Sequence, residues 1–324
     1  SAVFGQRSGV LARLAYQARS LSVGTKPRIF IVTQRSLQAP LPSPEYIRSL
    51  VFNLHKGIAV DPAELAEKLS SLGYIRVPKV GVPGEFTLRG EVLDVFTPGE
   101  ENPVRVLFDF DEISSIKTFN VESQSTLEIR ENLLVYPMKE VIWDDELIAR
   151  LEKVFARFGE GLDGDDENQN STGGLSESEG GKSIYLPLTE EAERAKNKIL
   201  SELKASRESE GEEFFYGALW ERKFTLFDYI SPETTVFFYD YDRLNNMKEN
   251  FDREYAGIYR KARLIMPVLP PCEMLIPFEE LSKSHEHSVS FRSLHTETDD
   301  ENFSNHDGIN NNWHLDTFKS HSFA

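Results

Sequence analysis

The sequence predicts an α/β part that is interrupted by a compact α+β unit with an antiparallel sheet. Strong helix-start signals at residues 61–64 are followed by a series of short strands and turns up to residue 138. Segments that mix helical periodicity with isolated apolar runs flank this unit on both sides, at 1–58 and 139–280. The 324 residues are enough for two domains or for one domain split by another.

The first segment, residues 1–58, is predicted to be an α/β piece with a basic surface. Its apolar residues near the start predict a helix beginning near Ser8, and the run at 28–33, RIFIVT, is typical of a buried strand. Eight Arg or Lys residues stand against Glu45 alone. Such a segment could contact DNA phosphates or an acidic partner, and the candidate DNA-contacting residues are Arg7, Arg13 and Arg19. The alternative interpretation is a solvated helix face.

The second segment, residues 59–138, is predicted to be an antiparallel meander packed against one helix. Asp61 is a suitable N-cap, Pro62 suits the first helical position, and Gly73 is a credible residue to end the helix. Strands are expected at 74–80, 86–97, 104–110 and 113–119, with a turn at 98–103.

Residues 139–280 are predicted to continue the α/β part. They contain a helix capped by Asp144, a helix over 189–207 and a strand over 235–239. An acidic, polar stretch at about 159–183 interrupts them and is expected to be disordered. The polar tail, residues 281–324, is expected to be disordered as well.

The composition excludes several classes of protein. Cys272 is the one cysteine, so neither a disulfide framework nor a cysteine zinc site is expected. No apolar run is long enough to span a membrane, and no signal peptide is visible, so a cytoplasmic protein is expected. The acidic run 163–167 lacks the glycine and glutamate of a calcium loop. No metal site and no catalytic residue is predicted.

The most specific motif begins with PGEFTLRGEVLDVFTPG at 83–99 and continues with PVRVLF at 103–108 and DEISSI at 111–116. It resembles the UvrA-binding domain shared by UvrB and the bacterial transcription-repair coupling factors. Residues 225–229 and 269–271 resemble the continuation of the coupling factor's split first domain, so the resemblance covers roughly 30–280. It implies a degenerate helicase-like (RecA-type) α/β domain, with 1–58 as a remnant of its first half, into which the UvrA-binding domain is inserted.

The resemblance implies that Arg89 and Arg105 contact UvrA. Both would project from one face of neighbouring antiparallel strands, and a guanidinium can pair bidentately with a carboxylate of a partner. The alternative is that they pair within the sheet, with Glu91 or Asp94. Two further residues of the expected contact are Phe110 and Asp109. Asp109 stands where the family has an aromatic residue, and a bulge would be needed to bring Phe110 to the same face.

An enzyme is the main alternative, because UvrB has a similar motif and is an ATP-dependent enzyme. The chain has no complete phosphate-binding loop, since Ser176 stands where the motif ending at 181–183 needs Gly. Asp240 could match a magnesium aspartate, but Tyr241 replaces the catalytic glutamate. We therefore expect a non-catalytic adaptor without a cofactor. By the resemblance, ATP, magnesium, RNA polymerase and DNA would be bound by domains outside this chain. A UvrB-like helicase fragment and a basic DNA-contacting module remain the alternatives.

Overall fold

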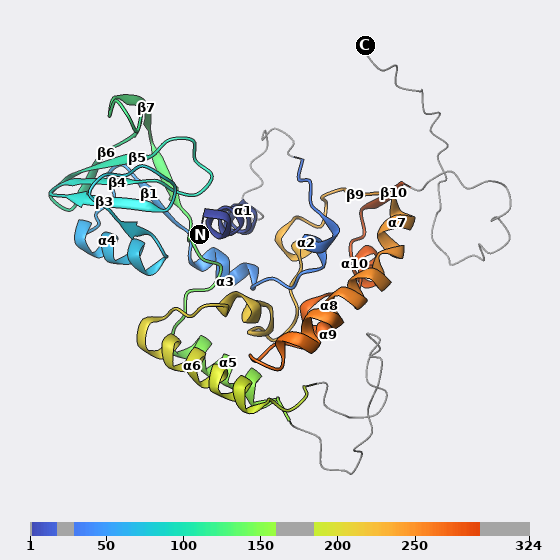
Figure 1. The fold of residues 1–324 in the computed structure, drawn as a ribbon. Helices are drawn as coiled ribbons and strands as arrows, with labels where there is room; N and C mark the ends of the chain where they lie inside the picture. Colours follow the sequence, from blue (N-terminus) through green and yellow to red (C-terminus); the bar gives the residue numbers. More distant parts are fainter. Residues whose placement is uncertain (1, 18–28, 160–184, 292–324) are drawn as a thin grey trace, which may run out of the picture.

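In the computed structural model, the described residues are 2–17, 29–159 and 185–291. They form a sheet domain and a mostly helical body, joined by the segments just before residue 52 and just after residue 135 (Figure 1). This mixed arrangement agrees with the predicted α/β plus α+β class at the level of the elements. No helix in these described ranges is both long and apolar enough to cross a membrane.

The sheet domain is built on a six-stranded sheet in the order β2-β3-β4-β5-β6-β7. Its neighbouring strands are antiparallel except for the β2–β3 pair, which is parallel. The strands are β2 (Ile75–Arg76), β3 (Glu85–Arg89), β4 (Val92–Val95), β5 (Val104–Asp109), β6 (Glu112–Phe119) and β7 (Thr126–Arg130). The predicted meander is therefore correct, but two of its strands differ from the expectation. The strand expected at 74–80 is reduced to the two residues of β2, and the one expected at 86–97 is two antiparallel strands, β3 and β4, because the chain turns between Arg89 and Val92.

Helix α4 (Pro62–Ser71) covers the inner face of this sheet and begins and ends where the sequence predicts. The Asp61 carboxylate accepts hydrogen bonds from the amides of Ala63, at 2.6 Å, and Glu64, at 3.3 Å. Gly73 follows the helix with a φ of +90°, a conformation that favours glycine. Leu65 and Leu69 of the helix share a buried core with apolar side chains of β3, β4, β5 and β6.

A second pair of strands closes the sheet domain. β1 (Phe52–His55) pairs antiparallel with β8 (Asn132–Val135), and residues of both strands belong to the same core as α4. The structure thus places the start of this domain at β1, before the residue 59 expected from the sequence. The reason is that β1 is short and has few apolar residues, and its pairing with a strand about 80 residues later leaves no local signal.

The helical body surrounds one large aromatic core and two smaller ones. The predicted N-cap Asp144 is confirmed, because its carboxylate accepts a hydrogen bond from the amide of Leu147. Thr189, where a helix was expected to begin, caps α6 by accepting from the amide of Ala192. Its elements are α1 (Ala2–Gln17), α2 (Gln34–Gln38), α3 (Pro44–Ser49), α5 (Asp145–Ala156), α6 (Glu190–Ser206), η1 (Glu212–Ala218), η2 (Leu226–Tyr229), β9 (Val236–Tyr239), α7 (Tyr241–Asn246), α8 (Lys248–Ala262), α9 (Pro271–Met274), α10 (Phe278–Ser284) and β10 (Ser288–Phe291).

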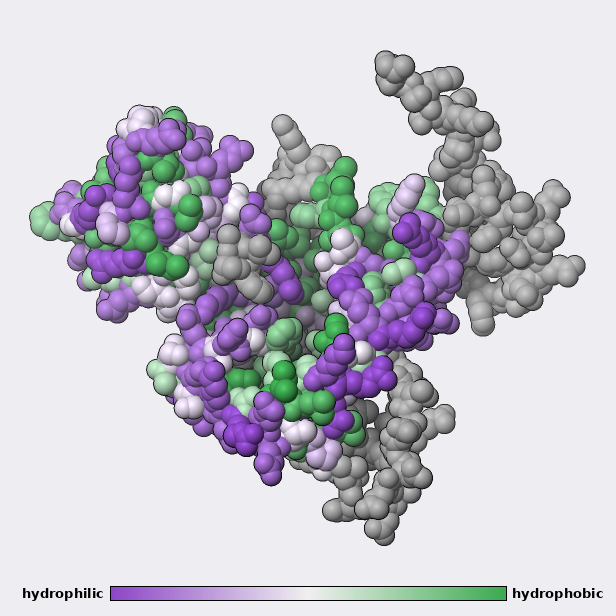
Figure 2. Space-filling view, in the orientation of Figure 1, coloured by the Kyte–Doolittle hydropathy of each residue, from purple (hydrophilic) through white to green (hydrophobic). Residues whose placement is uncertain are grey.

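The buried strand expected at 28–33 is wrong. The described part of it, residues 29–33, has no regular structure, and Ile31 is 93% exposed. Figure 2 shows hydrophobic surface at this part of the chain, which leads into α2. A parallel strand is stabilised by neighbouring strands, and in the described part of the chain β9 pairs with β10 instead. The apolar run alone could not reveal that its neighbours are absent there.

The expectation that the tail, residues 281–324, is disordered is wrong for its first part. Residues 281–291 are ordered, because Leu281 of α10 is buried and a ring nitrogen of His285 lies 2.6 Å from the carbonyl oxygen of Thr234. β10 then pairs in parallel with β9. These contacts join residues about 50 positions apart, so composition alone could not predict them. The rest of the tail and nearly all of the expected acidic insert lie outside the described residues.

Candidate protein-docking face

The candidate docking face is the side of the six-stranded sheet that faces away from α4. The register places Asp94 opposite Arg105, Arg105 opposite Lys117, and Lys117 opposite Ile129. Side chains directly opposite each other on neighbouring strands project from the same face. We call this row, together with Arg89 at the end of β3, the outer face.

Arg105 is held by a bidentate ion pair with Asp94. Its Nε lies 2.7 Å from Oδ1 and its Nη2 lies 2.8 Å from Oδ2 of that carboxylate. Nη2 also donates to Oε1 of Gln124, at 3.0 Å, and the guanidinium lies 4.5 Å from the ring centre of Phe119. The hydrogen bond with Asp94 raises the pKa of Arg105 above its usual value. The alternative interpretation, pairing within the sheet, is thus what the structure shows for this arginine.

Arg89 is brought to the same carboxylate but is held much less tightly. Its Nη2 lies 3.6 Å from Oδ2 of Asp94, and its side chain is 59% exposed, compared with 25% for Arg105. Asp94 itself is almost fully buried. The two predicted arginines therefore meet at one buried acid, and Arg89 keeps donors that face solvent.

The bulge that would bring Phe110 to the outer face is not found in β5, because the shift in register leaves Ser114 of β6 as the extra residue. The register shifts between Leu107 and Phe108, and Asp109 ends β5 opposite Glu112. Phe110 lies in the tight turn that follows, with a φ of +56° and an 81% exposed ring. The amide of Phe108 donates to the carbonyl of Glu91, so this tip lies beside the β3–β4 turn that follows Arg89.

Two side chains that complete the site were not predicted. Gln124 reaches Arg105 from the β6–β7 turn with a φ of +58°, and Phe119 lies beneath the guanidinium. Asp94 was named only as a possible partner. Gln124 carries no local sequence signal, because its contact depends on how the β6–β7 hairpin folds over the sheet. Phe119 could have been found from its place two residues after Lys117 on the same strand.

The described arginines of the basic first segment make internal contacts. Arg7 Nε lies 3.0 Å from Oε1 of the buried Glu140, whose pKa is raised by burial and lowered in part by Arg7. Arg13 lies over the ring of Tyr136, at 5.4 Å, and approaches Glu100. Arg19 lies outside the described residues. The two arginines thus help to join α1 to the sheet domain.

Asp240, which was compared with a magnesium aspartate, is not part of a cluster of three or more metal-binding side chains in the described ranges. These ranges contain no group of three His, Cys, Asp or Glu side chains that could hold a metal ion. Asp240 precedes α7 in a left-handed conformation, with a φ of +59°, and the Tyr241 hydroxyl lies 3.1 Å from Oγ of Ser282. Tyr241 therefore packs as a structural residue beside α10.

The fold and the outer face define a small sheet domain with an arginine-rich face, and a family model matches it. Residues 52–141 are similar to the UvrB interaction domain, and the match begins at the first residue of β1. It also agrees with the boundary that the pairing of β1 with β8 places on the domain.

Similarity to whole proteins extends beyond the domain. The transcription-repair-coupling factor of Bacillus subtilis is 26% identical over 276 residues, which cover 85% of this chain and 22% of that protein. The corresponding factor of Borreliella burgdorferi is 36% identical over 128 residues, or 39% of this chain and 11% of that protein. UvrABC system protein B of Kosmotoga olearia is 32% identical over 148 residues, or 46% of this chain and 22% of that protein. The resemblance to the UvrB-like module of a coupling factor is confirmed, and the chain spans about a tenth to a fifth of these relatives.

Proposed function

We propose that this chain is a non-catalytic adaptor that recruits UvrA in nucleotide excision repair coupled to transcription. The observation that carries the proposal is the exposed Arg89 beside the buried Asp94 on the outer face of a UvrB interaction domain. A guanidinium that is anchored on one side and open on the other can pair with a carboxylate of a partner at little entropic cost.

Arg105 has a different part in this proposal. Its Nε and Nη2 are already bonded to Asp94 and Gln124, so it leaves mainly Nη1 for a partner. Arg105 supports the face and neutralises Asp94, which lets Arg89 turn outward. Phe110 adds an exposed aromatic ring at the tip of the hairpin, next to the turn that follows Arg89. Aromatic and arginine side chains are the usual anchors of protein interfaces.

The wider functions of the relatives are proposed for a longer protein and not for this chain. The match to the coupling factor over 85% of the chain supports a split RecA-type arrangement around the sheet domain. RNA polymerase binding, DNA translocation, ATP and magnesium would belong to other parts of such a protein. For this chain we propose no ATP hydrolysis, because the sequence has no complete phosphate-binding loop and Tyr241 takes the place of a catalytic carboxylate.

The proposal is tested by measuring the affinity of the purified chain for purified UvrA. Arg89→Ala is expected to weaken binding by about 2 kcal/mol, or about thirtyfold. Arg150→Ala is the matched control, because Arg150 pairs with Glu146 within α5 of the helical body. Unchanged affinity of an Arg89→Ala/Arg105→Ala double variant would refute the assignment of the face.

The similarity to UvrABC system protein B makes a helicase fragment the second candidate. An ATPase assay on the chain with DNA and UvrA separates the two. We expect no turnover above background. Turnover that is lost on Asp240→Ala would instead support the UvrB-like function.

A further inference from the structure

The outer face has an apolar side that the two arginines do not account for. On β7, Ile129 is 72% exposed and Leu127 is 52% exposed. Ile129 is directly opposite Lys117, so it projects from the same face as the arginines. Leu127 lies where the register of β6 and β7 shifts, and strand parity therefore does not place it on that face.

The position of β7 makes this apolar surface accessible. β7 lies at the edge of the six-stranded sheet, and in the described part of the chain β6 is its one neighbour. Natural edge strands are usually protected by charges, prolines or a covering element. β7 contains no proline, and its charged residues Glu128 and Arg130 have the opposite parity to Ile129, which leaves an apolar side chain on the outer side of the strand.

Ile129 is close enough to Arg105 to belong to one contact. Neighbouring strands lie about 4.8 Å apart, so two steps across the sheet separate the rows of Arg105 and Ile129 by about 10 Å. Phe110 lies five residues along the chain from Arg105, about 16 Å at the rise of a strand. A standard interface buries about 800 Å² on each partner, equivalent to a disc of about 16 Å radius. A contact that includes Arg105 and Phe110 therefore has room for Ile129.

We propose that the UvrA-docking face continues across the sheet to β7, with Ile129 as its apolar part. This inference rests on the proposed function. A charged pair alone makes a poor interface centre, because interface cores are depleted of charge and rich in apolar contact. Lys117, between Arg105 and Ile129, has no acidic partner within ion-pair distance among the described residues, so it adds a cation to the same row. The occupant is thus an acidic surface with an apolar patch.

A second copy of this chain fits the same surface less well. The chain has a formal net charge of −17, so two copies repel each other. The cationic row Arg89, Arg105 and Lys117 is continuous with the apolar strand, and edge-to-edge pairing of two copies would leave that row without a partner.

The test replaces Ile129 with Thr, which keeps a β-branched side chain that suits a strand. We expect the affinity for UvrA to fall about fivefold to tenfold, with unchanged thermal unfolding, because the side chain is mostly exposed. The matched control is Ile75→Thr on β2, at the opposite edge of the same sheet, where the isoleucine is 67% exposed. We expect no change in affinity for that variant.

The outcomes separate this inference from the function on which it rests. Normal affinity of Ile129→Thr together with weak binding of Arg89→Ala would overturn the extension to β7 and leave UvrA binding in place. Normal affinity of both variants would overturn the assignment of the outer face, whereas failure of the parent chain to bind UvrA would overturn the proposed function. Equal losses for Ile129→Thr and Ile75→Thr, or a dimer of the free chain that Ile129→Thr abolishes in light scattering, would also overturn the extension.

Discussion

At the scale of single residues, Asp94 decides how the arginines of the outer face are held. The expectation that Arg89 and Arg105 share a face is correct, but the two arginines do not lie on neighbouring strands, because β4 lies between β3 and β5. The sequence could not decide whether these arginines pair with a carboxylate of a partner protein or with an acidic residue of the same sheet. That choice depends on the burial of Asp94 and on Gln124, which arrives from a different hairpin.

Asp94→Asn is expected to destabilise the protein. The amide cannot take two charge-assisted bonds from Arg105, so we expect a loss of about 2 kcal/mol in the free energy of unfolding. Chemical denaturation measures this loss. Glu128→Gln is the control, because Glu128 is mostly exposed and its contact with Arg130 is long, at 3.6 Å. Equal stability of Asp94→Asn and the wild type would show that the ion pair contributes nothing.

Phe110 is expected to lower the stability of the fold and to strengthen the binding of UvrA. A bulky side chain with a φ of +56° is strained, whereas asparagine adopts this conformation more readily. The ring is exposed and adds little to the core. Phe110→Asn should therefore stabilise the fold by about 0.5–1 kcal/mol and weaken UvrA binding. Denaturation and binding measurements on this variant check whether stability rises and affinity for UvrA falls. A loss of stability would mean that the Phe110 ring packs against the rest of the protein in solution.

At the scale of elements, a helix or strand was predicted correctly when the contacts that stabilise it are local in the sequence. The N-caps Asp61 and Asp144 act within three residues, and both were predicted. The run at 28–33 has the composition of a strand, but a strand also needs a distant neighbour. The same limit applies to β10, whose partner β9 lies about 50 residues away.

Asp61→Ala tests the cap that positions α4 beneath the sheet. Removing the carboxylate leaves the amides of Ala63 and Glu64 without their acceptor, and we expect a loss of about 1 kcal/mol. Asp61→Ser should recover most of the loss, since a serine hydroxyl can accept the same bonds. If serine were no better than alanine in thermal denaturation, the cap would not be the cause.

At the scale of the whole molecule, the segment 136–139 sets how the sheet domain sits on the helical body. Its residues bond alternately to the two parts. On the domain side, the Tyr74 hydroxyl donates to the carbonyl of Tyr136 at 2.7 Å, and the amide of Met138 donates to the carbonyl of Leu72 at 2.9 Å. Each of these contacts ties the exit of the sheet domain to the end of α4.

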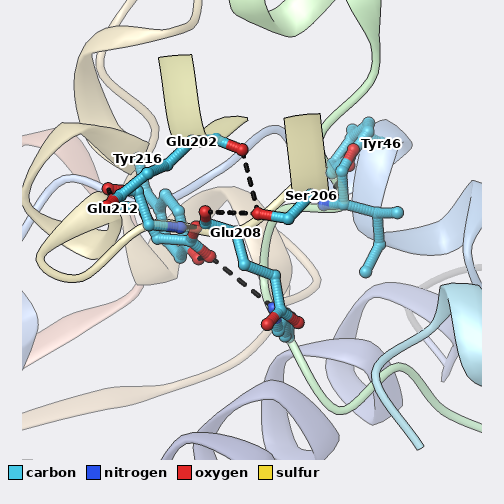
Figure 3. Close-up of polar contacts among 9 residues, drawn as sticks. Tyr46, Glu202, Ser206, Glu208, Glu212 and Tyr216 are labelled. Carbon is cyan, nitrogen blue, oxygen red and sulfur yellow. Dashed lines mark hydrogen bonds and ion pairs between the residues drawn. The ribbon is translucent and has the colours of Figure 1, made fainter. Parts of the chain in front are cut away.

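The helical body holds the same segment from the other side. The buried Ser8 hydroxyl of α1 lies 2.8 Å from the carbonyl oxygen of Pro137 and 3.1 Å from that of Lys139. Lys139 Nζ pairs with Glu208 at 2.5 Å and lies 3.9 Å from Glu212, whose pKa is raised mainly by burial. Figure 3 shows Glu208 and Glu212 gathered beyond the end of α6, with Ser206 hydrogen-bonded between α6 and residue 208.

Because the segment is clamped on both sides, the outer face should keep one orientation relative to the helical body. Removing the clamp with Ser8→Ala and Lys139→Met should leave both cores intact but allow the two parts to rotate. Spin labels at Ser123, on the β6–β7 turn, and Lys198, on α6, are both exposed and report the distance between the parts. Cys272 is replaced by Ser in all variants so that it is not labelled.

The distance distribution, measured by double electron–electron resonance, should be narrow in the parent and clearly broader in the double variant. Arg150→Ala should leave it narrow, because that ion pair lies within α5. A distribution in the double variant as narrow as in the parent would show that the contact of Arg13 with Tyr136 holds the domain without help from Ser8 and Lys139. If the distribution broadens while the affinity for UvrA is kept, the clamp acts on the direction in which UvrA is presented, since the outer face itself is unchanged.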